Sequence, residues 1–551
     1  MTDFTPRHRQ TNLSRRKFLQ IIGVSGITTL VAAGCSAPLQ NRAASVNAVA
    51  DATNSDADVD VEFSLTAAES TISILPGKET TVWRYTGEVL KGDPLALQHL
   101  SDAYLGPILR LHKGQKVRIH FQNELSEASI IHWHGLLVPA EMDGHPKYAV
   151  GPGESYIYEF EVKNQAGTYW FHPHSHGRAG EQTYKGLAGL FLVMDEDEQA
   201  LDLPAGEYEL PLVLQDRIFD AENQFVYQAE TGGASGTMGG MNHGNMGGGM
   251  DDMMTQMMGQ LGDRILVNGH LDATLEVATR VYRLRLLNGS NARIYKLAWA
   301  DGAPLTVIGT DDGLLERPVQ KEYVTLAPGA RVDLWADFSQ DAVGTERKLR
   351  SLSFSGVEMG EMMGMMESSS LTQGIDLPIL TAHVVREEAE ERTLPERLVA
   401  FEKLDPTAAK NSDNPRRIEL SMQNMQWTLN GRSFEMDAVA ADEHAQLNEL
   451  ELWEFVNVPG QGMMADFMAH PMHIHGVHFQ VVERQVDPAY LAGWDSVSAG
   501  YVDEGWRDTV LVMPGERVRV LLRFSEPGTF LYHCHNLEHE DGGMMRNILV
   551  A

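Results

Sequence analysis

Four His-x-His pairs stand out in the sequence because each could present two imidazoles to one metal centre. They form two sets near opposite ends of the chain: His132/His134 and His172/His174, then His473/His475 and His533/His535. Residues i and i+2 of a β-strand point to the same face, so each pair would place its imidazoles side by side. Eight converging imidazoles could hold three metal ions. Neutral imidazole binds copper, zinc, iron and nickel, so the pairs alone do not select the metal.

Cys534 lies between the two histidines of the last pair. If His533 and His535 face the cluster, Cys534 faces the opposite way, into a separate site. The residues expected to complete that site are His470, His539 and, as a weak axial ligand, Met544. Two imidazoles, one thiolate and a long thioether describe a blue-copper electron-transfer centre. The backbone of Cys534 would link this centre to both neighbouring imidazoles.

Short β-strands must position these side chains. The apolar segments are short, often alternating, and bounded by Gly, Pro, Asn or Asp, as at residues 116–121, which is typical of strands. A Pro-Gly turn followed by an alternating strand that ends in Phe occurs over 152–160, 328–338 and 514–524. This repeat predicts three β-sandwich domains. The outer two carry the His pairs, so their interface must bring the pairs together. The middle one lacks them, and we expect it to act mainly as a spacer.

The N-terminus has the features of an export signal. Ser-Arg-Arg-Lys-Phe-Leu at 14–19 precedes a mildly apolar run, 21–33, that is too short to span a bilayer. We interpret residues 1–35 as a twin-arginine signal. The last four resemble a lipobox, which would attach the mature chain to a membrane through a lipid on Cys35; alternatively an ordinary signal peptidase cuts nearby and Cys35 is lost. Residues 36–60 read as a flexible tether. We therefore expect a periplasmic or cell-envelope protein.

Composition excludes several classes of function. The chain has 551 residues, 43% hydrophobic and 22% charged, which is ordinary for a soluble globular protein. Its 76 acidic and 44 basic residues give a formal charge of -32, which repels nucleic acid and attracts cations. Two cysteines cannot build a disulfide framework.

The His and Cys segments together resemble the four copper motifs of the multicopper oxidases. The matching segments are His132-Trp133-His134-Gly135, His172-Pro173-His174, His470-Pro471-Met472-His473-Ile474-His475 and the tail from His533 to Met544. The resemblance implies an all-β fold of three consecutive cupredoxin-like Greek-key sandwiches. It also implies four copper ions: a type 1 copper that takes electrons from the substrate, and a type 2/type 3 trinuclear cluster that reduces dioxygen to water.

Carried over position by position, the resemblance assigns each ligand. Type 1 copper takes His470, Cys534, His539 and Met544; type 2 takes His132 and His473; type 3 takes His134, His172, His174, His475, His533 and His535. His176 and His478 fall outside the motifs, and we expect structural roles for them. Reduction of dioxygen to water consumes protons, and Asp143 and Glu540 stand where the family places carboxylates that relay them.

The predicted organisation has three sandwiches and two Met-rich segments. The expected boundaries are 61–197 for the first domain, 205–345 for the second with a Met-rich insertion at 238–258, 346–400 for a Met-containing connecting segment, and 401–551 for the third.

The methionines indicate a substrate. Eight lie within 238–258 among Gly, Asn and Asp, and five within 359–366. Thioether sulfur prefers Cu(I), although a flexible low-complexity loop would also explain such a segment. The second cluster, with Asp466 and Met468 just before His470, resembles the bacterial cuprous oxidases of copper-efflux systems. That resemblance implies a substrate copper site of Asp466, Met468, Met359 and Glu361, the last standing where the family more often has Asp.

We therefore predict a monomeric multicopper oxidase that acts on Cu(I), and on phenolic or amine donors, with dioxygen as the acceptor and a role in copper tolerance. One alternative is a laccase or bilirubin-oxidase-like enzyme for organic substrates. Another is a copper-binding buffer or chaperone without turnover. A cupredoxin-type nitrite reductase would not need four His-x-His pairs.

Overall fold

The computed structural model describes residues 58–229, 255–357, 372–423, 426–457 and 468–551. The predicted export signal, Cys35 and most of the predicted tether lie outside these residues. Within them the chain forms three consecutive β-sandwiches, so the predicted fold class is confirmed. None of the helices in these ranges is long and apolar enough to cross a membrane.

The first sandwich pairs a four-stranded sheet with a five-stranded one. The first sheet contains β1 (Val61–Ile72), β2 (Thr80–Lys91), β5 (Lys116–Asn123) and β7 (Ser155–Glu161); the second contains β3 (Leu97–Gln98), β4 (Ile108–His112), β6 (Ile131–His134), β8 (Gly167–Pro173) and β9 (Gly189–Met194). The alternating burial of β5 places Val117, Ile119 and Phe121 in the core between the sheets.

The middle sandwich has a seven-stranded and a five-stranded sheet. The larger contains β10 (Glu209–Arg217), β11 (Arg264–Val267), β12 (His270–Leu271), β14 (Val281–Asn288), β16 (Leu305–Thr310), β17 (Gly313–Lys321) and β19 (Arg331–Asp337); the smaller contains β13 (Thr274–Ala278), β15 (Tyr295–Trp299), β18 (Val324–Leu326), β20 (Glu346–Ser351) and β21 (Leu377–Arg386).

The third sandwich has two five-stranded sheets. One contains β22 (Arg416–Gln423), β23 (Gln426–Leu429), β25 (Glu451–Asn457), β27 (Phe479–Val486) and β29 (Glu516–Leu522); the other contains β24 (His444–Ala445), β26 (His470–Ile474), β28 (Thr509–Val512), β30 (Gly528–Cys534) and β31 (Met545–Val550). The α-helices with both ends among the described residues are short: α2 (Ala179–Tyr184), α3 (Glu196–Gln199), α5 (Leu491–Ser498) and α6 (Leu537–Asp541). The 3-10 turns are η1 (Pro94–Ala96), η2 (Ala140–Met142), η3 (Pro146–Tyr148), η4 (Gly206–Tyr208), η6 (Pro406–Ala408) and η8 (Pro488–Tyr490).

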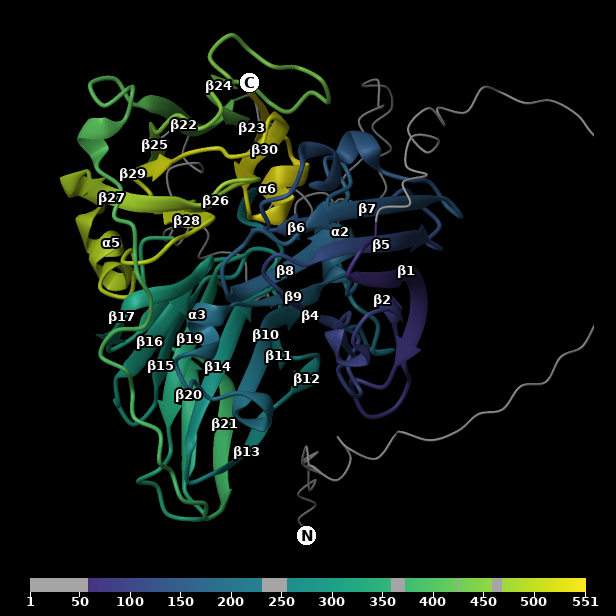
Figure 1. Cartoon of the computed structure of the whole chain (residues 1–551), viewed down its shortest axis with the longest axis vertical. Helices are drawn as coiled ribbons and strands as arrows, with labels where there is room; N and C mark the ends of the chain where they lie inside the picture. The colour runs from purple at the N-terminus through teal and green to yellow at the C-terminus, as the bar shows by residue number, and fades with distance from the viewer. Residues whose placement is uncertain (1–57, 230–254, 358–371, 424–425, 458–467) are drawn as a thin grey trace, which may run out of the picture.

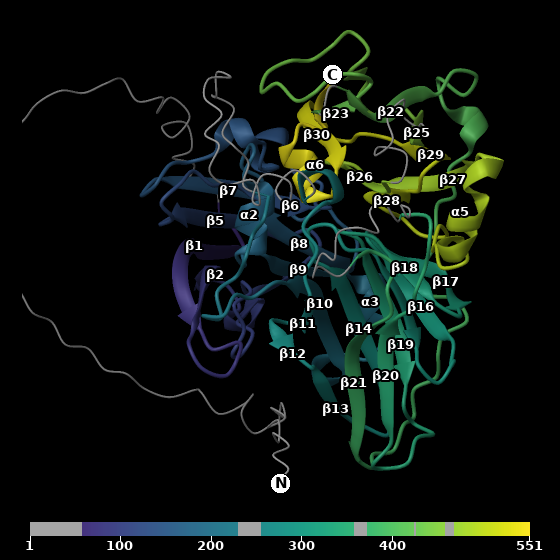
Figure 2. The same ribbon diagram turned by 180° about the vertical axis from the view of Figure 1, so that it is seen from behind.

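The three-fold sequence repeat corresponds to a repeated strand arrangement. In each sandwich a parallel pair is followed by an antiparallel one: β1–β5–β7, β10–β14–β19 and β22–β25–β29. The strand after each Pro-Gly turn is the last of its trio. The third sandwich packs beside the first, and the middle one lies below both (Figure 1), as the reverse view also shows (Figure 2).

Two strands differ from the predicted organisation. β20 and β21 lie in the predicted connecting segment 346–400, but they pair with each other and with β15 and β13 of the middle sandwich. Four of the six residues of β20 are charged and at least partly exposed, whereas Leu349 and Ser351 are buried. With one apolar residue among four charged ones, β20 lacks the alternating apolar pattern from which a strand is predicted.

Candidate metal centre

The four His-x-His pairs lie on, or at the ends of, paired strands in equivalent registers. In the first sandwich β6 and β8 place His132 opposite His172, and in the third β26 and β30 place His473 opposite His533. The second histidine of each pair, which is the last residue of β6 or directly follows β8, β26 or β30, lies on the same side as the first, with ring centroids 5.0 to 6.2 Å apart within the pairs. All eight imidazoles are at most 1% exposed. The two outer sandwiches therefore present matching sets of buried imidazoles.

The two sets meet at the interface between the first and third sandwiches. The rings of His132 and His475 stack with centroids 3.6 Å apart, and those of His134 and His473 stack at 3.7 Å. His174 Nε2 lies 3.4 Å from His533 Nε2. The structure thus brings together side chains more than 300 positions apart in the sequence.

The hydrogen bonds of these rings leave unprotonated nitrogens facing each other. His132 Nδ1 lies 2.7 Å from the carbonyl oxygen of Asp143, and His473 Nδ1 lies 2.8 Å from that of Asp508. A carbonyl oxygen only accepts, so both Nδ1 atoms carry the hydrogen. The two Nε2 atoms, 3.3 Å apart, then point lone pairs at each other. Burial, together with neighbouring imidazoles, lowers both pKa values, although Asp508 partly opposes this shift at His473. The lowered pKa values disfavour a bridging proton.

A second pair of rings repeats this arrangement. His475 Nδ1 donates to the carboxylate of Asp143 at 2.7 Å, and His533 Nδ1 faces the carbonyl oxygen of Cys534 at 3.1 Å. Their Nε2 atoms lie 3.0 Å apart. Opposed buried lone pairs are repulsive unless a cation lies between them. The donor set therefore fits metal ions.

Cys534 lies in a separate site on the other face of β30, among buried apolar residues of the third sandwich. Its Sγ lies 3.5 Å from His470 Nδ1 and 3.6 Å from His539 Nδ1, and these two nitrogens are 3.3 Å apart. A three-coordinate ion with bonds of about 2 Å needs ligand atoms about 3.5 Å apart. Burial raises the pKa of the Cys534 thiol, so a bound cation would be needed to keep it as a thiolate. The near-equilateral triangle therefore fits a trigonal copper site.

Backbone hydrogen bonds hold Met544 beside this triangle. Its N–H donates to the His539 carbonyl oxygen at 2.9 Å, and its own carbonyl oxygen accepts from Cys534 N at 3.0 Å. Met544 is fully buried in the same core as Cys534. The ring of Trp427 covers His539, with centroids 4.1 Å apart.

Both carboxylates expected to relay protons contact the histidine cluster. Asp143 Oδ2 accepts from His475 at 2.7 Å, and burial raises the pKa of Asp143 well above its usual value. Glu540 lies 3.2 Å from His533 Nδ1 and 3.5 Å from His174 Nε2. Burial favours the neutral form of Glu540, but the two imidazoles lower its pKa overall.

Asp508 is a residue of the cluster that the sequence analysis missed. Its Oδ1 accepts from His134 Nε2 at 3.0 Å, and its backbone oxygen orients His473. Asp508 directly precedes β28, which pairs with β26. This pairing places Asp508 beside His473, and the packing of the third sandwich against the first brings its carboxylate to His134. One acid among 76 gives no local signal in the sequence.

The middle sandwich contributes to both sites. Arg331 on β19 donates to Asp508 Oδ2 at 2.6 Å and to Thr168 O at 2.8 Å, joining all three domains beneath the cluster. His539 Nε2 donates to the carbonyl oxygen of Met257 at 2.8 Å. The expectation that this domain acts mainly as a spacer is therefore wrong.

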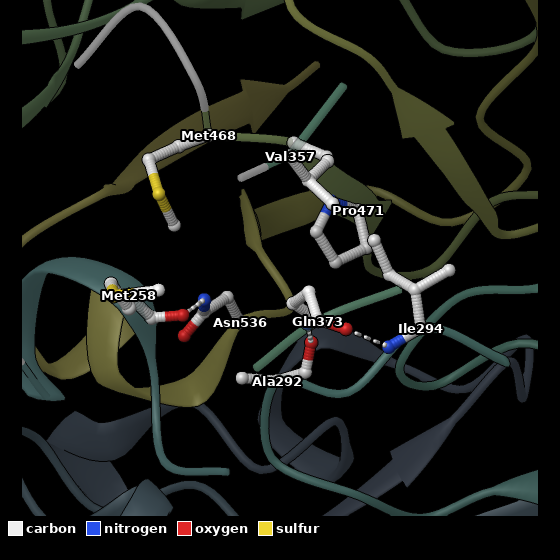
Figure 3. A pocket seen from close by; sticks show the side chains of 9 residues that line it. Met258, Ala292, Ile294, Val357, Gln373, Met468, Pro471 and Asn536 are labelled. Carbon is white, nitrogen blue, oxygen red and sulfur yellow. Dashed lines mark hydrogen bonds between the residues drawn. The ribbon is translucent and has the colours of Figure 1, made fainter. Parts of the chain in front are cut away.

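A cavity of ≈ 10 Å³ lies beside the Cys534 site, with room for about one water molecule. Its lining includes Met258, Met468 and Asn536, and Figure 3 shows the side chain of Met468 extending toward Met258. Asn536 also contacts Cys534 Sγ through its backbone N–H and His539 through its side chain. Two thioethers thus lie close to the Cys534 site.

Other predicted residues lie elsewhere. Asp466, Met359, Glu361 and the methionines from 238 to 254 are outside the described residues. His478 donates to the carbonyl oxygen of Gly135 at 2.7 Å, and His176 packs on Phe434 with ring centroids 5.1 Å apart.

Comparison with known proteins gives consistent matches. Two family models described as multicopper oxidase match residues 67–198 and 407–551. The chain is 30% identical to a multicopper oxidase of Staphylococcus aureus, over 81% of this chain and 82% of the relative. It is also 30% identical to the cell division protein FtsP of Edwardsiella tarda, over 98% and 99%. The crystal structure of the McoA multicopper oxidase of Aquifex aeolicus matches with a TM-score of 0.71 and 33% identity, over 90% and 96%.

Proposed function

Because the chain belongs to the multicopper oxidase family, we propose that it oxidises Cu(I), and also phenolic or amine donors, with dioxygen as the electron acceptor. Four copper ions held by the two sites would supply one-electron oxidation of the substrate and four-electron reduction of dioxygen to water. A role in copper tolerance follows from removal of Cu(I).

The observation that carries this proposal is the set of opposed imidazole nitrogens. His132 and His473, 3.3 Å apart, and His475 and His533, 3.0 Å apart, are buried and have their hydrogens committed to other acceptors. The cost of such lone-pair opposition is offset only by bound cations. Four imidazoles of this kind would not persist in a merely structural core.

We assign the ligands as the motifs imply. The type 1 site takes His470, Cys534, His539 and Met544; the type 2 site takes His132 and His473; the type 3 sites take His134, His172, His174, His475, His533 and His535. The backbone of Cys534 connects the first site to the others through its two neighbouring histidines. Asp143 and Glu540, each in contact with cluster histidines, would deliver protons to dioxygen as it is reduced.

Soft sulfur next to the type 1 site supports Cu(I) as the substrate. Met258 and Met468 line one cavity, and Asn536 of the same cavity contacts Cys534 and His539. Thioethers prefer Cu(I) over harder cations. The cavity of ≈ 10 Å³ is too small for a phenol, so an organic donor would have to act from outside it. Asp466, Met359 and Glu361 remain proposed substrate ligands.

The test uses an oxygen electrode with Cu(I) and with a phenol. Cys534→Ser should abolish blue absorption and oxygen uptake with both donors; uptake that survives would refute the mechanism. Met258→Leu/Met468→Leu should slow Cu(I) oxidation more than phenol oxidation. Met436→Leu, at a partly buried methionine of the third sandwich, is the control. An equal loss with both donors would refute the cuprous assignment.

A non-catalytic role is the second candidate, because the match to a cell division protein covers 98% of the chain. A protein in such a role, or a copper buffer, would show no oxygen uptake even when loaded with copper. The complete set of candidate ligands favours the oxidase.

We also propose export through the twin-arginine signal at 1–35, with Cys35 either lipidated or removed. Arg15→Lys/Arg16→Lys should leave the unprocessed chain in the cytoplasm, as seen by cell fractionation. Normal processing of this variant would contradict the proposal.

A further inference from the structure

The middle residues of the four His-x-His pairs are Trp133, Pro173, Ile474 and Cys534. Two of these have oxidisable side chains. Cys534 already has a role, as the proposed link between the type 1 site and the cluster. Trp133 has the same covalent relation to the cluster, because it lies between His132 and His134 on β6. Its indole is fully buried and faces away from the cluster into the core of the first sandwich.

A row of tyrosines continues from Trp133 toward the surface. The ring of Tyr158 packs edge-on against Trp133 with centroids 5.2 Å apart. Tyr156 lies 4.9 Å from Tyr158, and Tyr148 lies 6.1 Å from Tyr156. Tyr158 is fully buried, whereas Tyr156 and Tyr148 are half-buried. Electron tunnelling weakens exponentially with distance, so four rings in contact carry an electron far faster than one long step.

The hydroxyl groups show where a proton can leave this row. Tyr158 OH donates to the Ile131 carbonyl oxygen at 3.0 Å and accepts from Ile131 N at 2.8 Å. Tyr156 OH donates to the carbonyl oxygen of Glu141 at 2.6 Å. A carbonyl oxygen is a weak base, so neither phenol readily loses its proton there. Tyr148, at the half-exposed end, can release its proton to water.

Trp170 is a second indole beside the cluster, but its ring contacts differ from those of Trp133. It stacks on His172 with centroids 4.2 Å apart, closer to the cluster than Trp133. Its other ring contacts in the described chain are with His134 and His535. An oxidised Trp170 would therefore have no aromatic neighbour to pass the oxidation outward. Trp133, in contrast, contacts Tyr158 and could pass the oxidation on to it.

We propose, resting on the oxidase function above, that Trp133, Tyr158, Tyr156 and Tyr148 form a protective electron relay. When substrate fails to deliver all the electrons that dioxygen requires, Trp133 gives one electron to the oxidised cluster and regains it from Tyr158. Tyr156 and then Tyr148 refill the row. The net change is loss of one electron and one proton from Tyr148: the electron reduces dioxygen and the proton goes to water. An external reductant returns the electron, water returns the proton, and the phenol is restored.

The test starves the copper-loaded protein of electrons. Protein reduced with a limiting amount of ascorbate is mixed with excess dioxygen, and tyrosyl radical is followed by electron paramagnetic resonance. Oxidation of the peptide that contains Tyr148 is measured by mass spectrometry. Turnovers completed before inactivation are counted. Tyr156→Phe keeps the ring but interrupts the row, and Tyr148→Phe removes its end. Tyr323→Phe, a half-buried tyrosine of the middle sandwich, is the control.

We expect a tyrosyl signal and Tyr148 oxidation in the wild type and in Tyr323→Phe, and loss of both in Tyr148→Phe. Tyr156→Phe should inactivate after several-fold fewer turnovers at an unchanged initial rate of oxygen uptake. Equal signals and equal turnovers in Tyr156→Phe and the wild type would overturn the relay. Copper binding without any oxygen uptake by the wild type would instead overturn the proposed function.

Discussion

Arg331→Met should destabilise the protein strongly even when no copper is bound. Arg331 is fully buried and binds both carboxylate oxygens of Asp508, at 2.8 and 2.6 Å. It also donates to the backbone oxygens of Thr168 and Asp311, each at 2.8 Å. Methionine fills similar volume but donates no hydrogen bond. The substitution therefore leaves a buried carboxylate and two buried carbonyl groups without these partners.

The expected magnitude follows from the orphaned charge. Removing one partner of a buried ion pair costs about 3–5 kcal/mol. A loss of about 1 kcal/mol lowers the melting temperature of a domain of roughly 150–250 residues by about 2–4 °C. The copper-free variant should therefore melt about 6–20 °C below the wild type.

Differential scanning calorimetry of the copper-free proteins measures this shift. Arg417→Met is the matched control, because Arg417 and its partner Glu419 are about half exposed, at 46% and 48%, and such pairs contribute about 0–1 kcal/mol. Adding Asp508→Asn to Arg331→Met should recover part of the loss, since the orphaned charge is removed. A single variant that melts like the control, or a double variant with fully additive losses, would refute the reasoning.

Three further predictions concern the site and its surroundings. Gly329→Ala should lower the copper content measured by elemental analysis, because a Cβ there would lie 3.0 Å from the His535 ring. Gly302→Ala is the control, because its Cβ would meet open space and the copper content should not change. The backbone strain should be similar in both variants, about 1–2 kcal/mol, since φ is +79° at Gly329 and +78° at Gly302. Burial lowers the pKa of His145 from 6.5 to about 4. Between pH 6.5 and pH 4, His145 is therefore protonated in the unfolded chain but still neutral in the folded one. Up to about 3 kcal/mol of stability should be lost by pH 4, and His145→Gln should flatten the melting temperature against pH; an unchanged slope would contradict this. Glu540→Gln cannot release a proton, so oxygen uptake should fall about 100-fold or more with copper content unchanged, and loss of copper would argue against the relay role.

Much of the candidate site could be predicted from local spacing. The side-chain period of a strand is two, so each His-x-His pair had to share a face and Cys534 had to lie opposite His533 and His535. The Pro-Gly repeats likewise predicted three sandwiches. Local spacing did not predict the strand β20 of the middle domain, because its charged residues hide the alternation of apolar and polar side chains. It also did not predict that this domain, which has no histidine pairs, would form hydrogen bonds to residues of both sites.

Sequence alone therefore determined which side chains can bind metal and on which face of a strand each one stands, because these follow from covalent spacing and backbone geometry. The tertiary structure decided which faces meet. Strand register set His132 opposite His172 and His473 opposite His533. Domain packing brought Asp508, Arg331 and the Met257 carbonyl oxygen to the histidines. Such contacts join residues far apart in the chain, and only the burial of one domain surface against another fixes them.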